Sequence, residues 1–264
     1  MLPRVNRIEC NDADYLLFQT NDVISNILYK TGDWEKFIIE ISNFFIKDVN
    51  EPLILDVGAN LGAYSIPLAK SIQSIGGKVI GFEPQRIIFY QLCGNIIINR
   101  LDNYYAYNQA VGHYDAVIEM PEVNYESNHN IGAFSLDQKL RTQLGIEKYV
   151  LASNSKIEMI MLNNLEINYA PSLIKIDVEG YELNVLKGAD KFLEKHNYPP
   201  LLFEAWDFDS FEEERKNLFE YINYLGYEIS LNIRQEYIAQ HPKNSRYIKF
   251  VSGVDGAINM VRER

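Results

Sequence analysis

The chain contains the sequence Leu53-Ile54-Leu55-Asp56-Val57-Gly58-Ala59-Asn60-Leu61-Gly62, and this stretch decides how the rest is interpreted. Its mostly apolar first half follows Pro52 and has the length and β-branched content of a buried parallel strand. The second half suits a tight turn into a helix. Its two glycines do not match the G-x-G-x-x-G fingerprint of dinucleotide-binding folds, because their spacing differs. We therefore predict a strand, a glycine turn and a helix without a dinucleotide site.

The charge beside this turn also argues against a phosphate ligand. A phosphate at a helix N-terminus requires free N–H groups and positive potential, whereas Asp56 places a carboxylate at the end of the strand. S-adenosylmethionine (SAM) has no phosphate, carries an ammonium and a sulfonium, and contains a ribose. Glu83 lies about 20 residues beyond the turn, where an acid that binds a ribose is expected. Asp56 and Glu83 together therefore favour SAM as the cofactor.

Strands and helices alternate through most of the chain. We predict further strands at residues 78–83, 104–111, 173–178 and 200–206, with helices at residues 63–75, 87–98, 180–196 and 211–225. This alternation is typical of a doubly wound parallel sheet. Residues 227–232 and 247–251 are predicted to pair as an antiparallel hairpin. The expected fold is α/β and Rossmann-like, with a mostly parallel seven-stranded sheet and an antiparallel terminal strand.

Two segments flank or interrupt this pattern. Residues 1–50 are predicted to form a strand and helix cap that packs on a methyltransferase-type core of residues 51–264. The amphipathic helix of this cap starts near Trp34, a residue that we assign to the core and not to the cofactor. Residues 112–160 lack a helical pattern and are interpreted as an insertion on the carboxyl side of the sheet. The insertion either lines the substrate site or only extends the sheet.

The composition restricts the partners and the location. The 264-residue chain carries a net charge of −11, which argues against nucleic acid as a partner. Cys10 and Cys93 lie outside any C-x-x-C pattern, and the four histidines form no recognisable metal motif. The first ten residues lack the apolar centre of a signal peptide, and no uncharged run has the length of a membrane span. We expect a cytoplasmic protein that binds no membrane, and we leave its oligomeric state open.

Carboxylates gather near the predicted ends of two later strands. Asp177 closes one apolar strand, Glu179 and Glu182 follow it, and Glu204 lies in the next strand. Glu179 and Glu182 also suit the first turn of a helix, where the helix dipole favours acids. Asp177 is our first choice of general base for methyl transfer to a hydroxyl, with Glu204 and Glu179 as alternates. We assign no metal ligand, and a divalent ion held by Asp177 and neighbouring acids is the alternative.

Three of these segments resemble motifs of the FkbM family of class I SAM-dependent methyltransferases. Residues 55–62 resemble its first motif, residues 81–84 its second, and residues 173–182 its distinctive I-K-I-D-x-E-G-x-E segment. The similarity covers about residues 22–206 and includes the loop of residues 130–136. This sequence departs from the family in that loop, because Ala133-Phe134 stands where small residues are usual.

The resemblance implies a Rossmann-like sheet, SAM as methyl donor and O-methylation of a hydroxyl on a sugar, glycan or secondary metabolite. It places the cofactor against residues of the first two motifs, namely Asp56, Gly58, Ala59, Asn60, Gly62, Glu83 and Pro84. The small-molecule or glycan acceptor would contact Ser135, Tyr181 and Glu182 beside the catalytic acids. The alternatives are N-methylation of a small amine and a SAM-binding protein without activity. A nicotinamide-dependent oxidoreductase is disfavoured by the glycine spacing and by Asp56.

Overall fold

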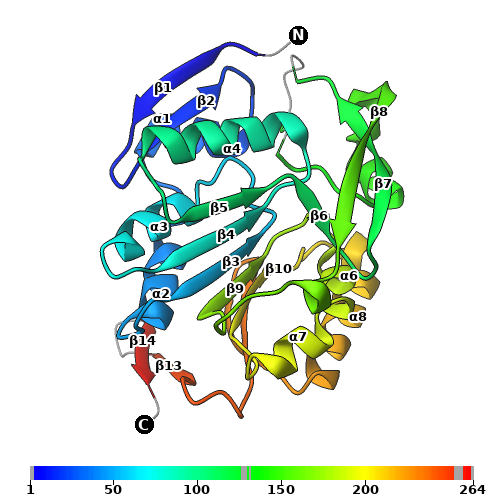
Figure 1. The fold of residues 1–264 in the computed structure, drawn as a ribbon. Helices are drawn as coiled ribbons and strands as arrows, with labels where there is room; N and C mark the ends of the chain where they lie inside the picture. The colour runs from blue at the N-terminus through cyan, green and yellow to red at the C-terminus, as the bar shows by residue number, and fades with distance from the viewer. Residues whose placement is uncertain (1–2, 126–129, 131, 253–257, 263–264) are drawn as a thin grey trace.

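A computed structural model describes residues 3–125, 130, 132–252 and 258–262 (Figure 1). Its main sheet has seven strands in the order β11-β12-β10-β9-β3-β4-β5. They span Leu53–Val57 (β3), Lys78–Phe82 (β4), Tyr104–Tyr107 (β5), Leu173–Ile176 (β9), Leu201–Glu204 (β10), Glu228–Ile233 (β11) and Glu236–Gln240 (β12). Strands β5, β4, β3, β9 and β10 run parallel, and β12 is antiparallel to both of its neighbours. The predicted Rossmann-like α/β fold is confirmed.

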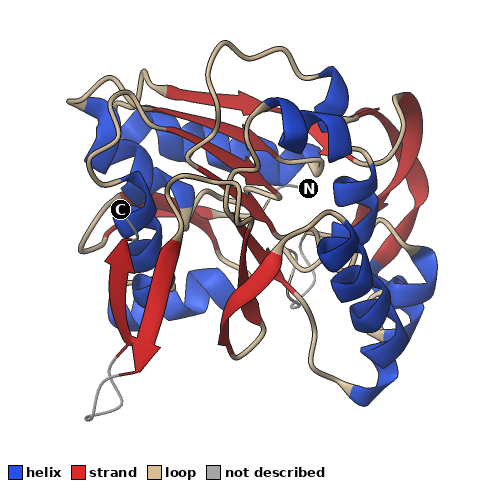
Figure 2. Cartoon of the chain, turned by 90° about the horizontal axis from the view of Figure 1, so that it is seen from below, coloured by secondary structure: helices blue, strands red, loops and turns tan. Residues whose placement is uncertain are grey.

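Helices cover both faces of this sheet (Figure 2). One face packs on α2 (Lys36–Ile46), α3 (Ser65–Gln73) and α4 (Arg86–Ile98), and the other packs on α6 (Glu182–Lys187), α7 (Asp190–Lys195) and α8 (Glu212–Tyr224). Strand β3 shows why both faces need a cover. Ile54 points into the first core, whereas Leu53 and Leu55 point into the second. Because successive side chains of a strand alternate between faces, an apolar strand must be covered twice.

Prolines and glycines explain where the helices depart from their predicted bounds. Pro67 lies in the first turn of α3, where its missing N–H has no intrahelical partner to lose, so the helix is not kinked there. The single helix predicted for residues 180–196 is wrong, because the structure has α6 and α7 instead. Gly188 separates them, and a Cβ at this position would overlap the carbonyl oxygen of Gly112. The backbone of the central insertion therefore touches the break between the two helices.

The predicted terminal hairpin is also wrong. Strand β11 pairs with β12, which was not predicted, through a short turn in which Arg234 has a φ of +59°. Residues 248–252 form β13 (Ile248–Ser252), which pairs with β14 (Ile258–Arg262) in a separate two-stranded sheet. The turn at Arg234-Gln235 contains neither glycine nor proline, so the sequence does not indicate that a hairpin forms there. Glu236 therefore enters the main sheet beside β10.

The N-terminal segment packs along the first face of the core. It comprises β1 (Val5–Glu9), β2 (Asp14–Phe18), α1 (Val23–Thr31) and α2. The α1 helix was not predicted; it begins after Asp22, whose side chain accepts a hydrogen bond from the Ser25 N–H at 2.8 Å. At the opposite end of the chain, the Arg262 guanidinium donates to the carbonyl oxygens of Phe44 and Lys47. The last described strand thus holds the end of α2.

The described residues between 109 and 160 leave the main sheet and form a second layer beside the carboxyl ends of its strands (Figure 1). The single strand predicted for residues 104–111 divides into β5 and β6 (Gln109–Val111). Strand β6 joins β7 (Ala116–Val123) and β8 (Val150–Ile160) in a three-stranded sheet ordered β6-β8-β7. The remaining short helices are α5 (Gln138–Gln143), η1 (Glu147–Tyr149), η2 (Leu162–Asn164) and η3 (Asp209–Phe211). Among the helices described, none is both long and apolar enough to cross a membrane.

Gly58, directly after β3, lies against the backbone of Asp177 at the end of β9. This residue has a φ of +91°, and a Cβ there would overlap the carbonyl oxygen of Asp177. The Gly58 N–H donates to the Phe82 carbonyl oxygen at 3.0 Å, which also ties the turn to β4. The glycine is therefore required by the contact between the ends of three neighbouring strands.

We predict that Gly58→Ala lowers the free energy of unfolding by about 3 kcal/mol or more, because it adds both backbone strain and a backbone clash. Urea unfolding at equilibrium measures the change. Gly145→Ala is the matched control, since Gly145 has a φ of +67° but open space around the position of a Cβ. It should cost about 1 kcal/mol. Equal effects of the two substitutions would contradict the clash.

Candidate active site

A cavity of about 250 Å³ opens at the carboxyl ends of the central strands. Its wall is built from the turn after β3, the segment after β4, the ends of β9 and β10 and the start of β12. The N-terminal segment and the central insertion add residues from outside the main sheet. In open α/β sheets this edge is where ligands bind, because the strand ends and the following turns leave a crevice there.

Asp56 is the most deeply buried acid of the cavity wall. This residue lies in β3 and is only 1% exposed. Its Oδ2 atom has no hydrogen-bond partner among the described residues. Burial raises the pKa of Asp56 to about 6, while Lys175 and a hydrogen bond from Ser65 oppose the rise. A buried carboxylate oxygen without a partner is costly unless a ligand donates to it.

Glu83 connects the turn after β3 with the segment after β4, and both line the cavity. Its Oε2 accepts a hydrogen bond from the Asn60 N–H at 2.9 Å, and its Oε1 accepts one from the Gln85 N–H at 2.7 Å. Asn60 has a φ of +51°, so the first contact supports a backbone conformation that is uncommon for a residue with a Cβ. Burial raises the pKa of Glu83 to about 8, against the two backbone hydrogen bonds.

Lys175 is the functional residue that the sequence analysis missed. It lies within β9, is 3% exposed, and donates from Nζ to Asp177 Oδ2 at 2.5 Å. Its Nζ also lies 5.2 Å from the centre of the Tyr64 ring. Burial opposes its charge, but Asp177, Glu236 and further acids raise the pKa of Lys175 well above the ordinary value. The available signal was a lysine two residues before an acid in an apolar strand, since such residues share a face.

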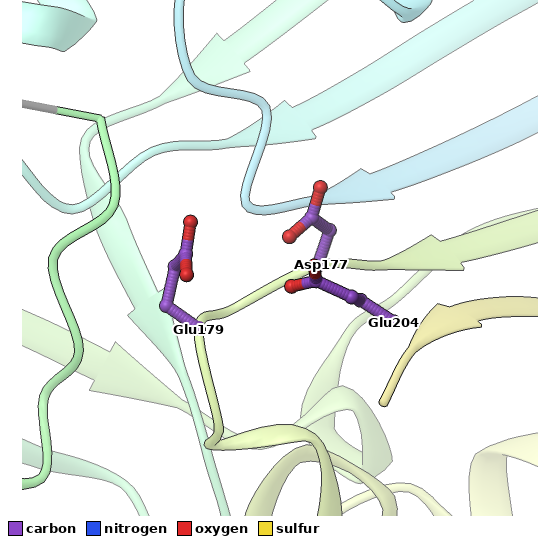
Figure 3. Close-up of side chains that lie close together, drawn as sticks. All are labelled: Asp177, Glu179 and Glu204. Carbon is purple, nitrogen blue, oxygen red and sulfur yellow. The ribbon is translucent and has the colours of Figure 1, made fainter. Parts of the chain in front are cut away.

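The carboxyl groups of Asp177, Glu179 and Glu204, which line the cavity, lie close together (Figure 3). One carboxylate oxygen of each lies within 4.8 Å of one oxygen of both others. Burial and the neighbouring acids raise the pKa of Glu204 to about 11, and burial with the charges of Asp177 and Glu182 raises the pKa of Glu179 well above its usual range. The structure thus brings together the three residues that the sequence analysis assigned to catalysis.

Two further acids reach the same cavity from elements that the sequence analysis did not connect with it. Glu35 precedes α2 with a φ of +40°, and Glu236 begins β12. Each has an Oε2 atom that is shielded from solvent and lacks a hydrogen-bond partner among the described residues. Trp34 was assigned to the core alone. Trp34 packs against the core, but it also lines the cavity.

The predicted ligand residues divide into two groups. Those that line the cavity are Asp56, Gly58, Ala59, Asn60, Glu83, Pro84, Asp177, Glu179 and Glu204. Four others lie outside its lining, namely Gly62, Ser135, Tyr181 and Glu182. Their roles in ligand binding stay predictions.

Local contacts account for the positions of these four residues. A Cβ at Gly62 would meet the side chains of Ile66 and Leu92 in the core, so this glycine is required by packing. The fully buried Ser135 hydroxyl accepts from the Asp137 N–H at 3.1 Å. Tyr181 is half-buried beside Gly112, and Glu182 Oε1 accepts from the N–H groups of Val178 and Gly180.

Two further openings adjoin the three converging acids. A cavity of about 160 Å³ shares Glu204 with the main cavity, and another of about 340 Å³ shares Glu179 and Ala133 with it. Trp206 lines both of these openings, and its Nε1 donates to Glu204 at 3.1 Å. An acceptor that enters through either opening would therefore meet a carboxyl group beside the main cavity.

A family comparison agrees with this geometry. Residues 56–229 match the sequence profile described as the Methyltransferase FkbM domain, which is more than half of the chain. The chain belongs to the FkbM family of SAM-dependent methyltransferases. The resemblance inferred from the three sequence motifs is thereby confirmed. The matched range contains Asp56, Glu83 and the three converging acids, but it excludes the N-terminal segment with Glu35 and the start of β12 with Glu236.

Several solved structures are similar to the chain at low sequence identity. The methyltransferase FkbM from Methylobacillus flagellatus KT is 21% identical with a TM-score of 0.48, and the match covers 73% of this chain and 44% of that one. A SAM-dependent O-methyltransferase from Thermotoga maritima is 10% identical with a TM-score of 0.47, covering 98% and 72%. TYW2 from M. jannaschii, solved in complex with AdoMet, is 14% identical with a TM-score of 0.42, covering 90% and 84%. A search of curated proteins finds no match.

We predict that the ligand-free protein loses stability as the pH rises through neutrality, and that Glu182 contributes to this loss. Burial raises the pKa of Glu182 to about 7 from an unfolded value of 4.5. The folded state therefore binds the proton of Glu182 more tightly than the unfolded state does. The stability that this proton contributes is fully present below about pH 4.5 and is lost as the pH rises through about 7.

Glu182→Gln removes this titration but keeps an oxygen that accepts from the two backbone N–H groups. Urea unfolding at pH 5 and pH 8 should show a smaller loss in the variant, by up to about 3 kcal/mol. Glu220→Gln, on the exposed side of α8, is the control and should behave as the wild type. Parallel pH dependence in Glu182→Gln and the wild type would show that Glu182 does not contribute.

Proposed function

We propose that the chain binds SAM in the main cavity and methylates a hydroxyl group on a sugar, glycan or secondary metabolite. One observation carries the proposal. Asp56, Glu83 and Asp177 lie at or just beyond the ends of three neighbouring parallel strands, and all three line one cavity. Family membership supports the use of SAM, and the acids beside the two adjoining openings support an acceptor that must lose a proton.

The cavity has the polar groups that SAM requires. The unpartnered Oδ2 of Asp56 offers an acceptor to a cationic group, and Lys175, the single Lys or Arg of the described wall, is already ion-paired with Asp177. Asp56, Gly58 and Asn60 would hold the methionine part, and Glu83 would hold the ribose. When bound there, SAM supplies a methyl group activated by its positive sulfur. The protein then has to position the acceptor and remove its proton.

Asp177 is the best placed of the three acids to act as the base. Its Oδ2 is held by the ion pair with Lys175, whereas burial and the neighbouring acids raise the pKa values of Glu179 and Glu204 and so favour their protonated forms. In the proposed step, the acceptor oxygen bonds to the methyl carbon as the carbon–sulfur bond breaks. The bonding electrons move to sulfur, giving neutral S-adenosylhomocysteine, and Asp177 receives the hydroxyl proton.

An amine acceptor is the second candidate, and the charge of the cavity favours it. Seven carboxyl groups line the described wall, from Glu35, Asp56, Glu83, Asp177, Glu179, Glu204 and Glu236, against the single lysine Lys175. An ammonium ion would bind well among these acids. It would lose its proton more easily than a hydroxyl, so the base would matter less for the chemical step.

We predict that Asp56→Asn weakens binding of S-adenosylhomocysteine and SAM by about tenfold or more, which corresponds to about 1.4 kcal/mol. The substitution keeps the shape of the side chain but removes the negative charge that faces the ligand. Isothermal titration calorimetry measures the affinity. The control is Glu158→Gln, an exposed acid on β8. An unchanged affinity in Asp56→Asn would contradict the proposed position of SAM.

Asp177→Asn distinguishes the two acceptor classes. For a hydroxyl acceptor we expect kcat to fall by about 10² to 10⁴ with little change in KM, because the base is lost. For an amine acceptor we expect mainly an increase in KM. The acceptor is first identified by incubating extracts with isotopically labelled SAM and analysing the labelled product by mass spectrometry. A variant with wild-type kcat and KM would exclude Asp177 from both roles.

A further inference from the structure

The charge on the cavity wall is unbalanced where Asp177, Glu179 and Glu204 meet. Lys175 is the only Lys or Arg side chain among the described residues of the wall, and it is already ion-paired with Asp177 and lies over the Tyr64 ring. SAM adds one net positive charge, and Asp56 offers it an acceptor near the glycine turn. Several acids of the described wall therefore remain without a cation of their own.

The spacing of the three acids is that of ligands around one ion. One oxygen of each acid lies within 4.8 Å of one oxygen of both others, and the acids come from the ends of β9 and β10 and from the turn between β9 and α6 (Figure 3). Three oxygens spaced evenly around Ca²⁺ are about 4.0–4.5 Å apart, because each metal–oxygen bond measures about 2.3–2.6 Å. Around Mg²⁺, with bonds of about 2.0–2.1 Å, they are about 3.5–3.6 Å apart. The three acids can therefore bind Ca²⁺ after a small contraction and Mg²⁺ after a larger one.

Glu236 gives independent evidence of a missing ligand. It pairs directly with Glu204 in the antiparallel register of β10 and β12, so both side chains leave the same face of the sheet. Its Oε2 is enclosed in the same cavity and has no hydrogen-bond partner among the described residues. A buried carboxylate oxygen in this position requires either a proton or a cation.

We propose that Asp177, Glu179 and Glu204 bind a divalent cation that prefers oxygen ligands, such as Mn²⁺, Mg²⁺ or Ca²⁺, and that Glu236 supports the site from the adjoining strand. The ion neutralises the acids and would polarise an acceptor hydroxyl, easing its deprotonation by Asp177. Only this chemical role rests on the proposed function. Binding of the ion does not depend on the acceptor.

Carboxyl groups bind a cation in their deprotonated form, so protons compete with the ion and the affinity of the site should increase with pH. This behaviour separates a coordinated ion from loose screening by the negative surface of the protein. Screening would involve no stoichiometric loss of protons.

The test uses the full chain after treatment with EDTA and dialysis. Mn²⁺, Mg²⁺ and Ca²⁺ are titrated by calorimetry in two buffers of different ionisation enthalpy, and Mn²⁺ binding is followed by electron paramagnetic resonance. We expect saturable binding at one site with a Kd below about 10⁻³ M and release of protons. Glu179→Gln and Glu204→Gln should each weaken binding at least tenfold, whereas the exposed control Glu220→Gln should not.

Thermal unfolding provides a second readout that does not require activity. In EDTA the two Gln variants should be at least as stable as the wild type, because each removes a buried carboxyl group. Added Mn²⁺ should raise the Tm of the wild type and of Glu220→Gln but not of the two site variants. This pattern also shows that the variants fold.

The proposal is overturned if none of the three ions gives saturable binding, or if both site variants bind as the wild type does. SAM affinity measured in EDTA separates this result from the fate of the proposed function. A protein that binds SAM but no ion would refute the metal site alone. A protein that binds the ion but not SAM would refute the proposed function and leave the metal site standing.

Discussion

The cavity depends on one partly buried ion pair, between Lys175 and Asp177 at the end of β9. A lysine that is 3% exposed in the middle of the sheet is stable only if acids surround it, and the surrounding acids are stable only if a cation is near. Asp56, Glu35 and Glu236 all act on Lys175 from other elements. The charged groups of the wall therefore stabilise one another. Because the acids outnumber the lysine among the described residues, the cavity favours cationic ligands.

Part of this arrangement could be predicted because parallel strands bring their carboxyl ends to one edge. Asp56, Glu83, Asp177 and Glu204 each lie at or next to the end of an apolar run, so the strand pattern was enough to bring them together. The same reasoning predicted most of the sheet. It also read Lys175 as an ordinary strand residue, since an isolated lysine gives no periodic signal and acquires its role only from its neighbours.

The missing parts depend on contacts between distant segments. Glu236 reaches the cavity because the chain turns back at Arg234, so that β12 lies beside β10. Arg234 has a positive φ, but it is not a glycine, so the sequence gives no signal of this turn. Glu35 reaches it through another positive φ and the packing of α2. Gly62 resembles a ligand-binding glycine in the motif, yet the side chains of Ile66 and Leu92 explain it. A motif names residue types, whereas the fold decides which of them face the ligand.

The hydrogen bonds from Arg262 to the end of α2 have a consequence for how the protein is made. Phe44 and Arg262 are 218 positions apart, and α2 follows directly after Glu35. On the ribosome, the central strands and their acids can assemble while this anchor is still inside the exit tunnel or not yet translated. The wall that carries Glu35 gains this support only after residue 262 has left the exit tunnel. A nascent chain would therefore contain the acidic centre before it contains the complete cavity.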